Sequence, residues 1–444
     1  LNSSPILIIS EVTLMKIKRL LCLALVPIIV LMVSCSGGKE NQAVTQSTEA
    51  EVDYSGTVLN VCDRFAGNNP PSSLGYLNYS RLSTDTGIKF ITSRYFIDET
   101  KVKLLANDSD VDIYIVASSE VPDYMSAGYY TPIESDVIEK YIDSCHEVLS
   151  ELAYASDKIA FMPVSLSINA ILIPISAISE TEVTPEKIEY LDDFLKFVRE
   201  YDGNRIAYTN SSSLFSDLEN QYEILYFSDT SNKDINFITP EYMHIYSEIL
   251  SYTNSDDKIG ATLGFEHNLT GDYSNNSEKA LCTFGSYSSA ENFTDKRLNT
   301  DPNVYMTSGS TDFFEKWRAF PIPKISEEVT SNSASAAFAF INPFSENKDA
   351  ALYVLETIAS DFYKYAGNNS KYSMMFSDIS AYPDYFYTDS NIFSDYFEML
   401  KNAKLSKFVF PAARTDIDDY QAGKLTLEEA VAEYQRQVDI WLNE

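Results

Sequence analysis

The stretch KIAFMPVSLSINAILI, residues 158–173, is a long, mostly apolar segment that separates two regions of similar pattern. Before it, short apolar runs alternate with segments of helical periodicity. These predict strands at 58–61, 88–92 and 111–116, and helices at 73–84 and 100–106. After it the alternation resumes, with helices expected at 185–201 and 239–252. Alternating strands and helices are typical of a parallel sheet covered by helices, so we expect two α/β lobes.

The first part of the chain has the features of an export signal. Met15 opens MKIKRL, whose basic residues precede a mostly apolar run at 20–33. That run is shorter than the roughly 20 residues needed to cross a bilayer, and with the small Ser34 it is typical of a secretory signal peptide. The tetrapeptide MVSC resembles a bacterial lipobox, which implies a lipid anchor at Cys35; an ordinary cleaved signal is the alternative. Residues 1–34 are therefore assigned to an upstream extension and the signal.

A polar segment follows the expected anchor. Residues 35–54 contain almost no apolar side chains and cannot bury themselves, which predicts a flexible tether. Folding is expected to begin at Ser55, just before the run TVLNV. The remaining chain is longer than a single hydrophobic core usually serves, which again favours two lobes.

Composition excludes several classes of partner and cofactor. The chain has 33 basic and 65 acidic residues, a net charge of −32, which disfavours binding to nucleic acid or to anionic membranes. Beyond the signal and Cys35, only Cys62, Cys145 and Cys282 remain, without zinc spacing, and three buried thiols are expected. DSDVD, residues 108–112, imitates a calcium loop but lacks its glycine, so a solvated turn is expected. We therefore expect no metal and no cofactor.

Six segments, in this order, resemble the family 1 extracellular solute-binding proteins of ABC importers, which include the maltose-binding type. They are DIYIVASSEVPDYMSAGYYTPIE, SDKIAFMPVSLSINAILI, ALCTFGSYSSAEN, WRAFPIPK, SASAAFAFINPFSENKDAALYVLETIAS and AGKLTLEEAVAEYQRQVDIWLNE. The second is similar to the crossover that leaves the first lobe of that family, and the fifth to the return strand and its following helix. The resemblance extends over residues 57–444.

This resemblance implies a two-lobed type II periplasmic-binding-protein fold with a central ligand cleft and crossover hinge strands. The expected first lobe comprises 55–163 with 333–400, and the second 164–332 with 401–444. The implied function is that of a monomeric lipoprotein on the extracytoplasmic face of the cell membrane. It captures an oligosaccharide or similar polyhydroxylated solute and delivers it to two ABC permease subunits, which work with a cytoplasmic ATPase.

The sequence also departs from the family pattern. Ile173 and Pro174 replace the usual Tyr-Asn, and Tyr190 and Leu191 replace the usual Thr-Trp. The chain has only two Trp residues, so the Trp plates of many sugar-binding members are missing. Trp317 is expected to pack in a sheet and Trp441 to dock the last helix.

Candidate polar ligand contacts follow the first and third predicted strands. Asp63 and Arg64 stand at the carboxyl end of the first strand, where open α/β sheets bind ligands. Ser118, Ser119 and Glu120 end the third strand, and the resemblance places Ser119 where maltose-type relatives have an acidic sugar ligand. The alternative for both groups is a surface salt bridge or a loop cap.

Candidate aromatic contacts are Phe215 and Tyr287. A sugar presents C–H surfaces that pack on flat rings, and the chain has 31 Tyr and 25 Phe residues to supply them. The resemblance places Tyr287, in FGSYSS, at the family's cleft aromatic, and Phe215 follows NSSSL. The alternative is that both are ordinary packing residues.

Other classes of protein remain as alternatives. The three His residues, His146, His244 and His267, lie in no HExxH or GxSxG-like setting, and there is no GxxxxGK[ST] loop, so we expect no enzyme. A carbohydrate-cleaving glycosidase stays open because its two carboxylates need not be close in sequence. A peptide-binding receptor also stays open, whereas the repeats or β-sandwich pattern of an adhesive surface protein are not visible.

Overall fold

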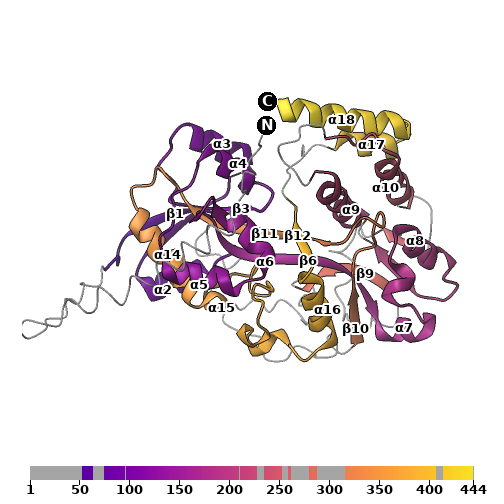
Figure 1. The fold of residues 1–444 in the computed structure, drawn as a ribbon, viewed down its shortest axis with the longest axis horizontal. Coiled ribbons are helices and arrows are strands. Elements are labelled where there is room, and N and C mark those ends of the chain that lie inside the picture. Colours follow the sequence, from indigo (N-terminus) through magenta and orange to yellow (C-terminus); the bar gives the residue numbers. More distant parts are fainter. Residues whose placement is uncertain are drawn as a thin grey trace, which may run out of the picture. The chain divides into compact units, whose positions relative to one another are not determined.

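The computed structural model describes the chain from Asp53 to Asn443 with internal gaps. The described residues are 53–63, 75–95, 97–209, 211–227, 235–252, 259–261, 280–287, 316–406 and 414–443. Figure 1 shows these residues as a two-lobed α/β fold in which β6 and β11 run from one lobe into the other. Within this part of the chain, no helix is long and apolar enough to span a membrane.

The first lobe is built on a parallel sheet. Strand β1 pairs in parallel with β2 on one side and β3 on the other, as the βαβ pattern predicted. The strands are β1 (Val58–Asp63), β2 (Lys89–Ser93) and β3 (Ile113–Ala117). The helices between and after them are α2 (Tyr79–Thr86), α3 (Ile97–Leu105), α4 (Val121–Ala127), α5 (Asp136–Ser144) and α6 (Glu147–Ala153). A short hairpin of β4 (Tyr154–Ala155) and β5 (Lys158–Ile159) precedes the crossover.

Helix α2 begins later than its sequence pattern predicted. The prediction started at residue 73, but the helix starts at Tyr79, where the Asn78 side chain accepts a hydrogen bond from the Arg81 amide. The residue before this cap, Leu77, is held in a β-bridge to Ala366 instead. A tertiary pairing therefore overrides the local helical periodicity.

Strands β6 (Met162–Pro174) and β11 (Asn332–Ile341) carry the sheet from one lobe to the other. The order is β2-β1-β3-β11-β6-β9-β7-β8, with β12 (Ala403–Leu405) on β11 and β10 (Trp317–Phe320) on β6. The first half of β6 pairs antiparallel with β11, and its second half with β9 (Ala280–Ser286) and β10. Since both crossover strands belong to one continuous ladder, they form the hinge between the lobes.

The second lobe repeats the α/β construction. Strand β9 pairs in parallel with β7 (Ile206–Thr209), which pairs in parallel with β8 (Ile259–Ala261). Its helices are α7 (Ile175–Thr181), α8 (Leu191–Glu200), α9 (Ser211–Tyr226) and α10 (Pro240–Tyr252), with a 3-10 turn η1 (Pro185–Ile188) before α8. The helix predicted at 185–201 is thus divided in two, because Glu189 and Leu191 form backbone hydrogen bonds with Lys324.

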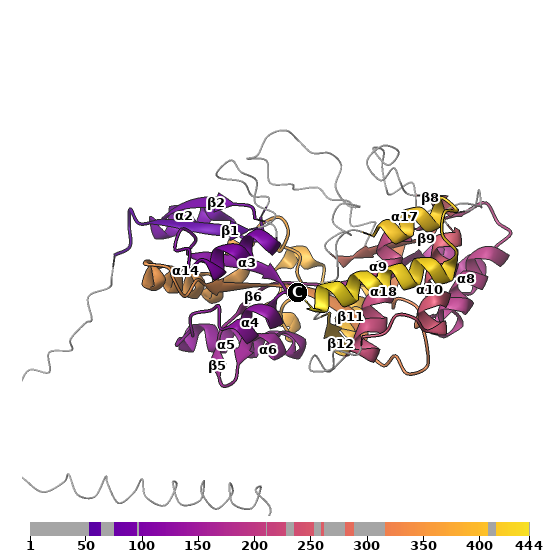
Figure 2. The same cartoon turned by 90° about the horizontal axis from the view of Figure 1, so that it is seen from above.

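The return segment after β11 contributes to both lobes. It comprises α14 (Lys348–Ser360), α15 (Phe362–Tyr365), η2 (Ile379–Ala381), η3 (Asp384–Phe386) and α16 (Asn391–Leu400). Helices α17 (Thr415–Gln421) and α18 (Leu427–Asn443) close the chain. Figure 2 shows α17 and α18 beside α9 and α10.

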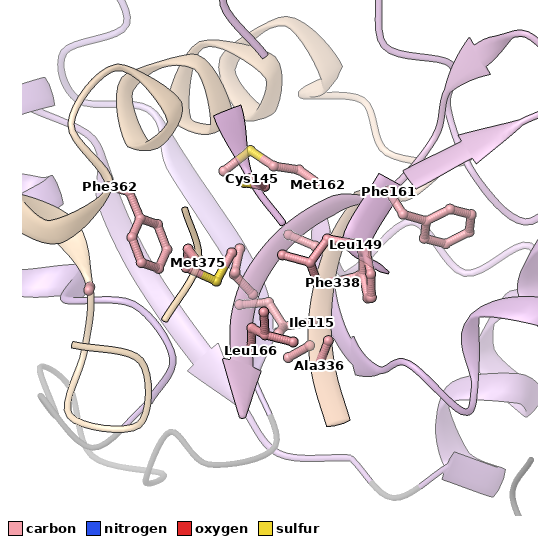
Figure 3. Close-up of a cluster of buried hydrophobic side chains, with 14 of the residues drawn as sticks. Ile115, Cys145, Leu149, Phe161, Met162, Leu166, Ala336, Phe338, Phe362 and Met375 are labelled. Atoms are coloured by element: carbon pink, nitrogen blue, oxygen red, sulfur yellow. The ribbon is translucent and has the colours of Figure 1, made fainter. Parts of the chain in front are cut away.

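Two hydrophobic clusters form the cores. The first gathers β1, β3, the first half of β6, β11 and the return segment; Figure 3 labels some of its residues, among them Leu166, Phe338 and Met375. The second gathers the end of β6, α8, α9, α10 and α18. Cys62, Cys145 and Cys282 are buried and form no disulfide with one another, as expected from their spacing.

A buried carboxylate fixes the first lobe's end of the return strand. Asp112 is 1% exposed and accepts hydrogen bonds from the Asn60 amide at 2.8 Å, the Ser345 hydroxyl at 2.5 Å and the Asn347 side chain at 3.2 Å. These three donors come from β1 and from the turn between β11 and α14. The motif INPFSENKDAA therefore joins the return strand to the two central strands of the first lobe.

Candidate cleft site

A polar cavity lies where the crossover strands meet α9. Its volume is about 330 Å³. Side chains of β6, β11 and α9 line it: Ser167, Asn169, Ser216, Asp217, Asn220, Ser333, Ala334 and Ser335. Seven of these eight residues carry a hydroxyl, an amide or a carboxylate, and none is basic. The cavity therefore offers hydrogen-bonding groups rather than a positive charge.

The alternation of side chains along a β-strand produces this lining. In β6, Ser167 and Asn169 are partly exposed, whereas Leu166 and Ile168 are buried. In β11, Ser335 is exposed and its neighbours are buried. Ser335 pairs directly with Ser167, so the two strands present their hydroxyls on one face, which we call the polar face. It comprises Ser167, Asn169, Ser333 and Ser335.

The opposite face of the same strands is covered. Leu166 and Ile168 face Tyr287, Tyr372, Met374 and Leu400 around a void of about 10 Å³, too small for a solute. We call this the apolar face. Figure 1 shows α16, at the end of the return segment, on the other side of β6 and β11 from α9. Only the polar face therefore leaves room for a ligand within the described part of the hinge.

Asp217 is the ionisable group of the cavity. It is 6% exposed, and the Asn169 amide donates to both of its carboxylate oxygens, at 3.0 and 3.2 Å. Burial raises the pKa of Asp217 to about 7, because the charged form loses its hydration, and the hydrogen bond from Asn169 opposes this only in part. Asp217 thus titrates near neutral pH at the wall of the cavity.

Helix α9 holds Asp217 in place from the core side. Leu214, Leu218 and Tyr222 of α9 are buried in the second cluster at helical spacing, which turns Asp217 and Asn220 toward the crossover strands. The Gln221 amide of the same helix donates to the carbonyl of Pro323 at 3.1 Å.

A mostly buried ion pair joins α9 to the C-terminal helices. Arg414 donates to Glu219 of α9 at 2.6 Å and to Asp416 at 3.0 Å, and its guanidinium lies 3.7 Å from the Tyr434 ring centre. Removing one member of such a buried pair leaves an uncompensated charge and typically costs about 3–5 kcal/mol. Helix α9, which forms one wall of the cavity, is therefore held firmly against the C-terminal helices.

The polar residues predicted in the first lobe are mostly occupied by local contacts. Asp63 is fully buried at the end of β1, and its carboxylate accepts hydrogen bonds from the Tyr76 amide at 2.9 Å and the Tyr79 hydroxyl at 2.8 Å. Glu120, 1% exposed, accepts from the Ala117 amide and the Tyr124 hydroxyl, both at 3.3 Å. Both carboxylates hold the loops that follow their strands, as in the loop-cap alternative.

Ser118 and Ser119 lie beside the crossover strands. The Ser118 amide donates to the Ala336 carbonyl at 2.8 Å, and its hydroxyl accepts from the Ala336 amide at 3.3 Å. Ser119 is partly exposed. The structure therefore brings this predicted pair next to β11, whereas Arg64 and Cys35, the predicted anchor residue, lie outside the described residues.

The two predicted aromatic contacts are buried in cores. Phe215 is 4% exposed and packs edge-on against Tyr242 and Tyr246 in the second cluster. Tyr287 is 3% exposed, stacks on Phe386 with ring centres 5.6 Å apart and donates its hydroxyl to the Phe386 carbonyl. These contacts favour the packing alternative for both rings; a direct ligand contact by either remains a prediction.

Other predicted features can be placed in the same way. Trp317 begins β10 and is 3% exposed, so it packs against the sheet as expected. Asp108, in the acidic turn, accepts from the Lys103 amine and the Asp110 amide. Among the residues that the structure describes, no cluster of His, Cys, Asp and Glu could hold a metal ion.

Comparison with known proteins identifies the fold. The ABC substrate-binding protein Lmo0181 of Listeria monocytogenes, solved in complex with cycloalternan, superposes with a TM-score of 0.60 at 12% sequence identity. The match covers 87% of this chain and 99% of that one. No protein-family model matches the sequence, and no curated protein matches it significantly. The chain therefore has the two-lobed fold of the substrate-binding proteins, at a sequence distance where only the fold can be compared.

Proposed function

We propose that this protein is the solute-binding component of an ABC importer and that it captures an oligosaccharide or a similar polyhydroxylated solute. The observation that carries the proposal is the polar cavity on the crossover strands of a two-lobed fold. Hinge motion about such strands closes two lobes on a ligand. A lining of hydroxyl, amide and carboxylate groups matches the hydrogen-bonding needs of a solute rich in hydroxyl groups.

Both lobes contribute to the proposed site. From the hinge and second lobe come the polar face together with Asp217 and Asn220. From the first lobe, Ser119 and Arg64 are proposed to meet the ligand as the lobes close, and Glu120 holds the loop that carries Ser119. Phe215 and Tyr287 are assigned packing roles that fix the cavity walls.

The protein is proposed to act at the membrane through a lipid at Cys35. The cysteine follows a signal-like segment and precedes a polar tether, which supports an extracytoplasmic position for the folded lobes. The implied partners are two permease subunits, which would receive the solute from a monomeric receptor. Cys35→Ser is expected to move the protein from the membrane fraction to the medium; unchanged membrane retention would contradict the anchor.

A glycosidase is the competing function. Such enzymes need two carboxylates about 5–10 Å apart across the scissile bond. Asp217 is the single carboxylate among the described residues that line the cavity. This observation favours binding without chemistry.

The test is a binding panel followed by recovery of the ligand. Cycloalternan, linear oligosaccharides, monosaccharides and short peptides are screened by thermal shift, and hits are titrated by calorimetry. We expect one oligosaccharide to bind in a one-to-one ratio and to be recovered chemically unchanged. Binding of peptides alone would overturn the proposed solute class, and cleavage of the sugar would move the protein to the hydrolases.

A further inference from the structure

We propose that Asp217 determines which solutes this site accepts: it binds neutral, hydroxyl-rich solutes as a carboxylate, and capture of such a solute releases a proton. The inference rests on the proposed function, because it concerns the same cavity. It adds the charge class of the solute and a dependence of affinity on pH.

The geometry around Asp217 leaves room for a ligand. Its one hydrogen-bonding partner among the described residues is Asn169, whose Nδ2 is shared by both carboxylate oxygens. A carboxylate has about four acceptor positions, so about two remain beyond those that Asn169 occupies, and Asp217 lines the cavity. Two adjacent hydroxyl groups of a sugar ring are donors of suitable spacing for these positions.

Among the described residues that line the cavity, no cation competes for this carboxylate. From β6 the cavity presents Ser167 and Asn169, and from β11 Ser333 and Ser335, none of which titrates. From α16, on the other side of the strands, the Tyr396 phenol donates to the Gly285 carbonyl at 2.6 Å; burial first, and then the charges of Asp395 and Asp217, raise its pKa well above 10.

The acids further along α9 are engaged elsewhere. Glu219 binds Arg414, and Glu223 accepts from the Ser406 hydroxyl at 3.2 Å. Asp217 is thus the group of the described cavity that changes charge near neutral pH.

The direction of the coupling follows from the hydrogen bonds. Without a solute, burial holds the pKa of Asp217 near 7, so a large part of the population is protonated at pH 6. Hydroxyl donors stabilise the carboxylate over the acid and lower that pKa in the complex. A proton must then leave as the solute binds, and affinity rises with pH up to about 7 and levels off above it.

The same arrangement sets the charge class. A solute with its own carboxylate or phosphate would place a second negative charge beside Asp217, in a cavity whose described lining has no basic residue. Because Arg64 is proposed to meet the ligand from the first lobe, this discrimination concerns the part of the solute that lies against Asp217: neutral hydroxyl groups are accepted there and the carboxylate of a uronic-acid counterpart is rejected. The net charge of −32 acts in the same direction at long range.

The experiment is calorimetric titration of the full-length protein with the neutral oligosaccharide selected by the panel. It is run at pH 5.5, 6.5 and 8, in pairs of buffers with different ionisation enthalpies, which count the protons released. Asp217→Asn is compared with Glu248→Gln, which also replaces a carboxylate by an amide but lies on α10, paired with Arg199 outside the cavity. The uronic-acid counterpart and an amino-sugar counterpart are titrated alongside.

We expect wild type and Glu248→Gln to bind about tenfold or more tightly at pH 8 than at pH 5.5 and to release a proton. Asp217→Asn should bind about tenfold more weakly at pH 8, with no proton release and no dependence on pH. Neutral sugar binding without proton release in wild type, proton release that persists in Asp217→Asn, or preference for a charged counterpart would each overturn the inference while leaving the receptor function standing. Absence of any carbohydrate binding would overturn both.

Discussion

The two faces of the crossover strands differ in the residues that surround them. On the polar face, Ser167 and Asn169 border a cavity and a carboxylate. On the apolar face, the alternate residues Leu166 and Ile168 are covered by Tyr287, which follows β9, and by Tyr372, Met374 and Leu400 of the return segment. The same two strands carry both faces. The alternation of side chains along them therefore assigns ligand binding to one face and core packing to the other. Mutations on the polar face should therefore mainly lower solute affinity, whereas mutations on the apolar face should mainly lower the free energy of unfolding.

The largest effect is expected for Phe386→Ala on the apolar side. Phe386 is fully buried, and its ring contacts Tyr287, Tyr363 and Tyr382. Its truncation should lower the free energy of unfolding by about 3–5 kcal/mol, as for other buried Phe residues, with little change in solute affinity of the folded protein. Urea unfolding and calorimetric titration measure the two quantities. The exposed neighbour Tyr385 serves as control, and a loss of stability in Tyr385→Ala as large as in Phe386→Ala would undermine the comparison.

Asp217→Asn should instead lower solute affinity and raise the free energy of unfolding above neutral pH. The pKa of Asp217 is raised from about 4 in the unfolded chain to about 7 in the folded one, so its contribution to stability is complete below pH 4 and is lost as pH rises through 7. The variant should therefore be more stable than wild type at pH 8, by up to about 4 kcal/mol, and show no such gain at pH 4. Urea unfolding at both pH values tests this. Equal stability of Asp217→Asn and wild type at pH 8 would mean that burial does not raise the pKa of Asp217.

Tyr287→Leu distinguishes a packing role for the Tyr287 ring from its predicted role as a flat surface that contacts the sugar. If the ring is a packing residue, its loss should cost about 2 kcal/mol of stability and leave affinity unchanged. If it is a ligand plate, affinity should fall at least tenfold while the unliganded melting temperature stays the same. Its burial against Phe386 leads us to expect the first outcome.

The smallest effect is expected for Ser335→Ala on the polar face. Its exposed hydroxyl adds little to the fold, and the loss of one neutral hydrogen bond to the solute should weaken binding about fivefold, or roughly 1 kcal/mol. Ser360→Ala, an exposed serine on α14, is the matched control. Equal affinities in the two variants would remove Ser335 from the site.

The sequence predicted the fold more fully than the site. Alternating apolar runs placed β1, β2 and β3 to within a few residues, because strand and helix periodicities are local properties. The polar alternation SLSIN in the crossover is typical of a strand with one solvent-facing side, a signal that the prediction of this segment as a connection between lobes did not include.

The remaining features depend on distant parts of the chain. Asp217 meets Asn169 across 48 positions, and Tyr287 meets the Phe386 carbonyl across 99. No local pattern indicates which side of the hinge each residue will face. Asp63 was predicted from its place at the end of β1, but the Tyr76 amide that occupies its carboxylate comes from a later loop. Such pairings arise from tertiary packing, which a single sequence does not display.

The central claim is that the solute binds on the polar face of the crossover strands. A crystal structure of the protein with its tightest-binding oligosaccharide tests it most directly. We predict that the sugar lies against Ser167, Asn169 and Ser335, with two of its hydroxyl groups donating to Asp217. A sugar bound instead over Tyr372 and Tyr385, on the apolar side, would contradict the account.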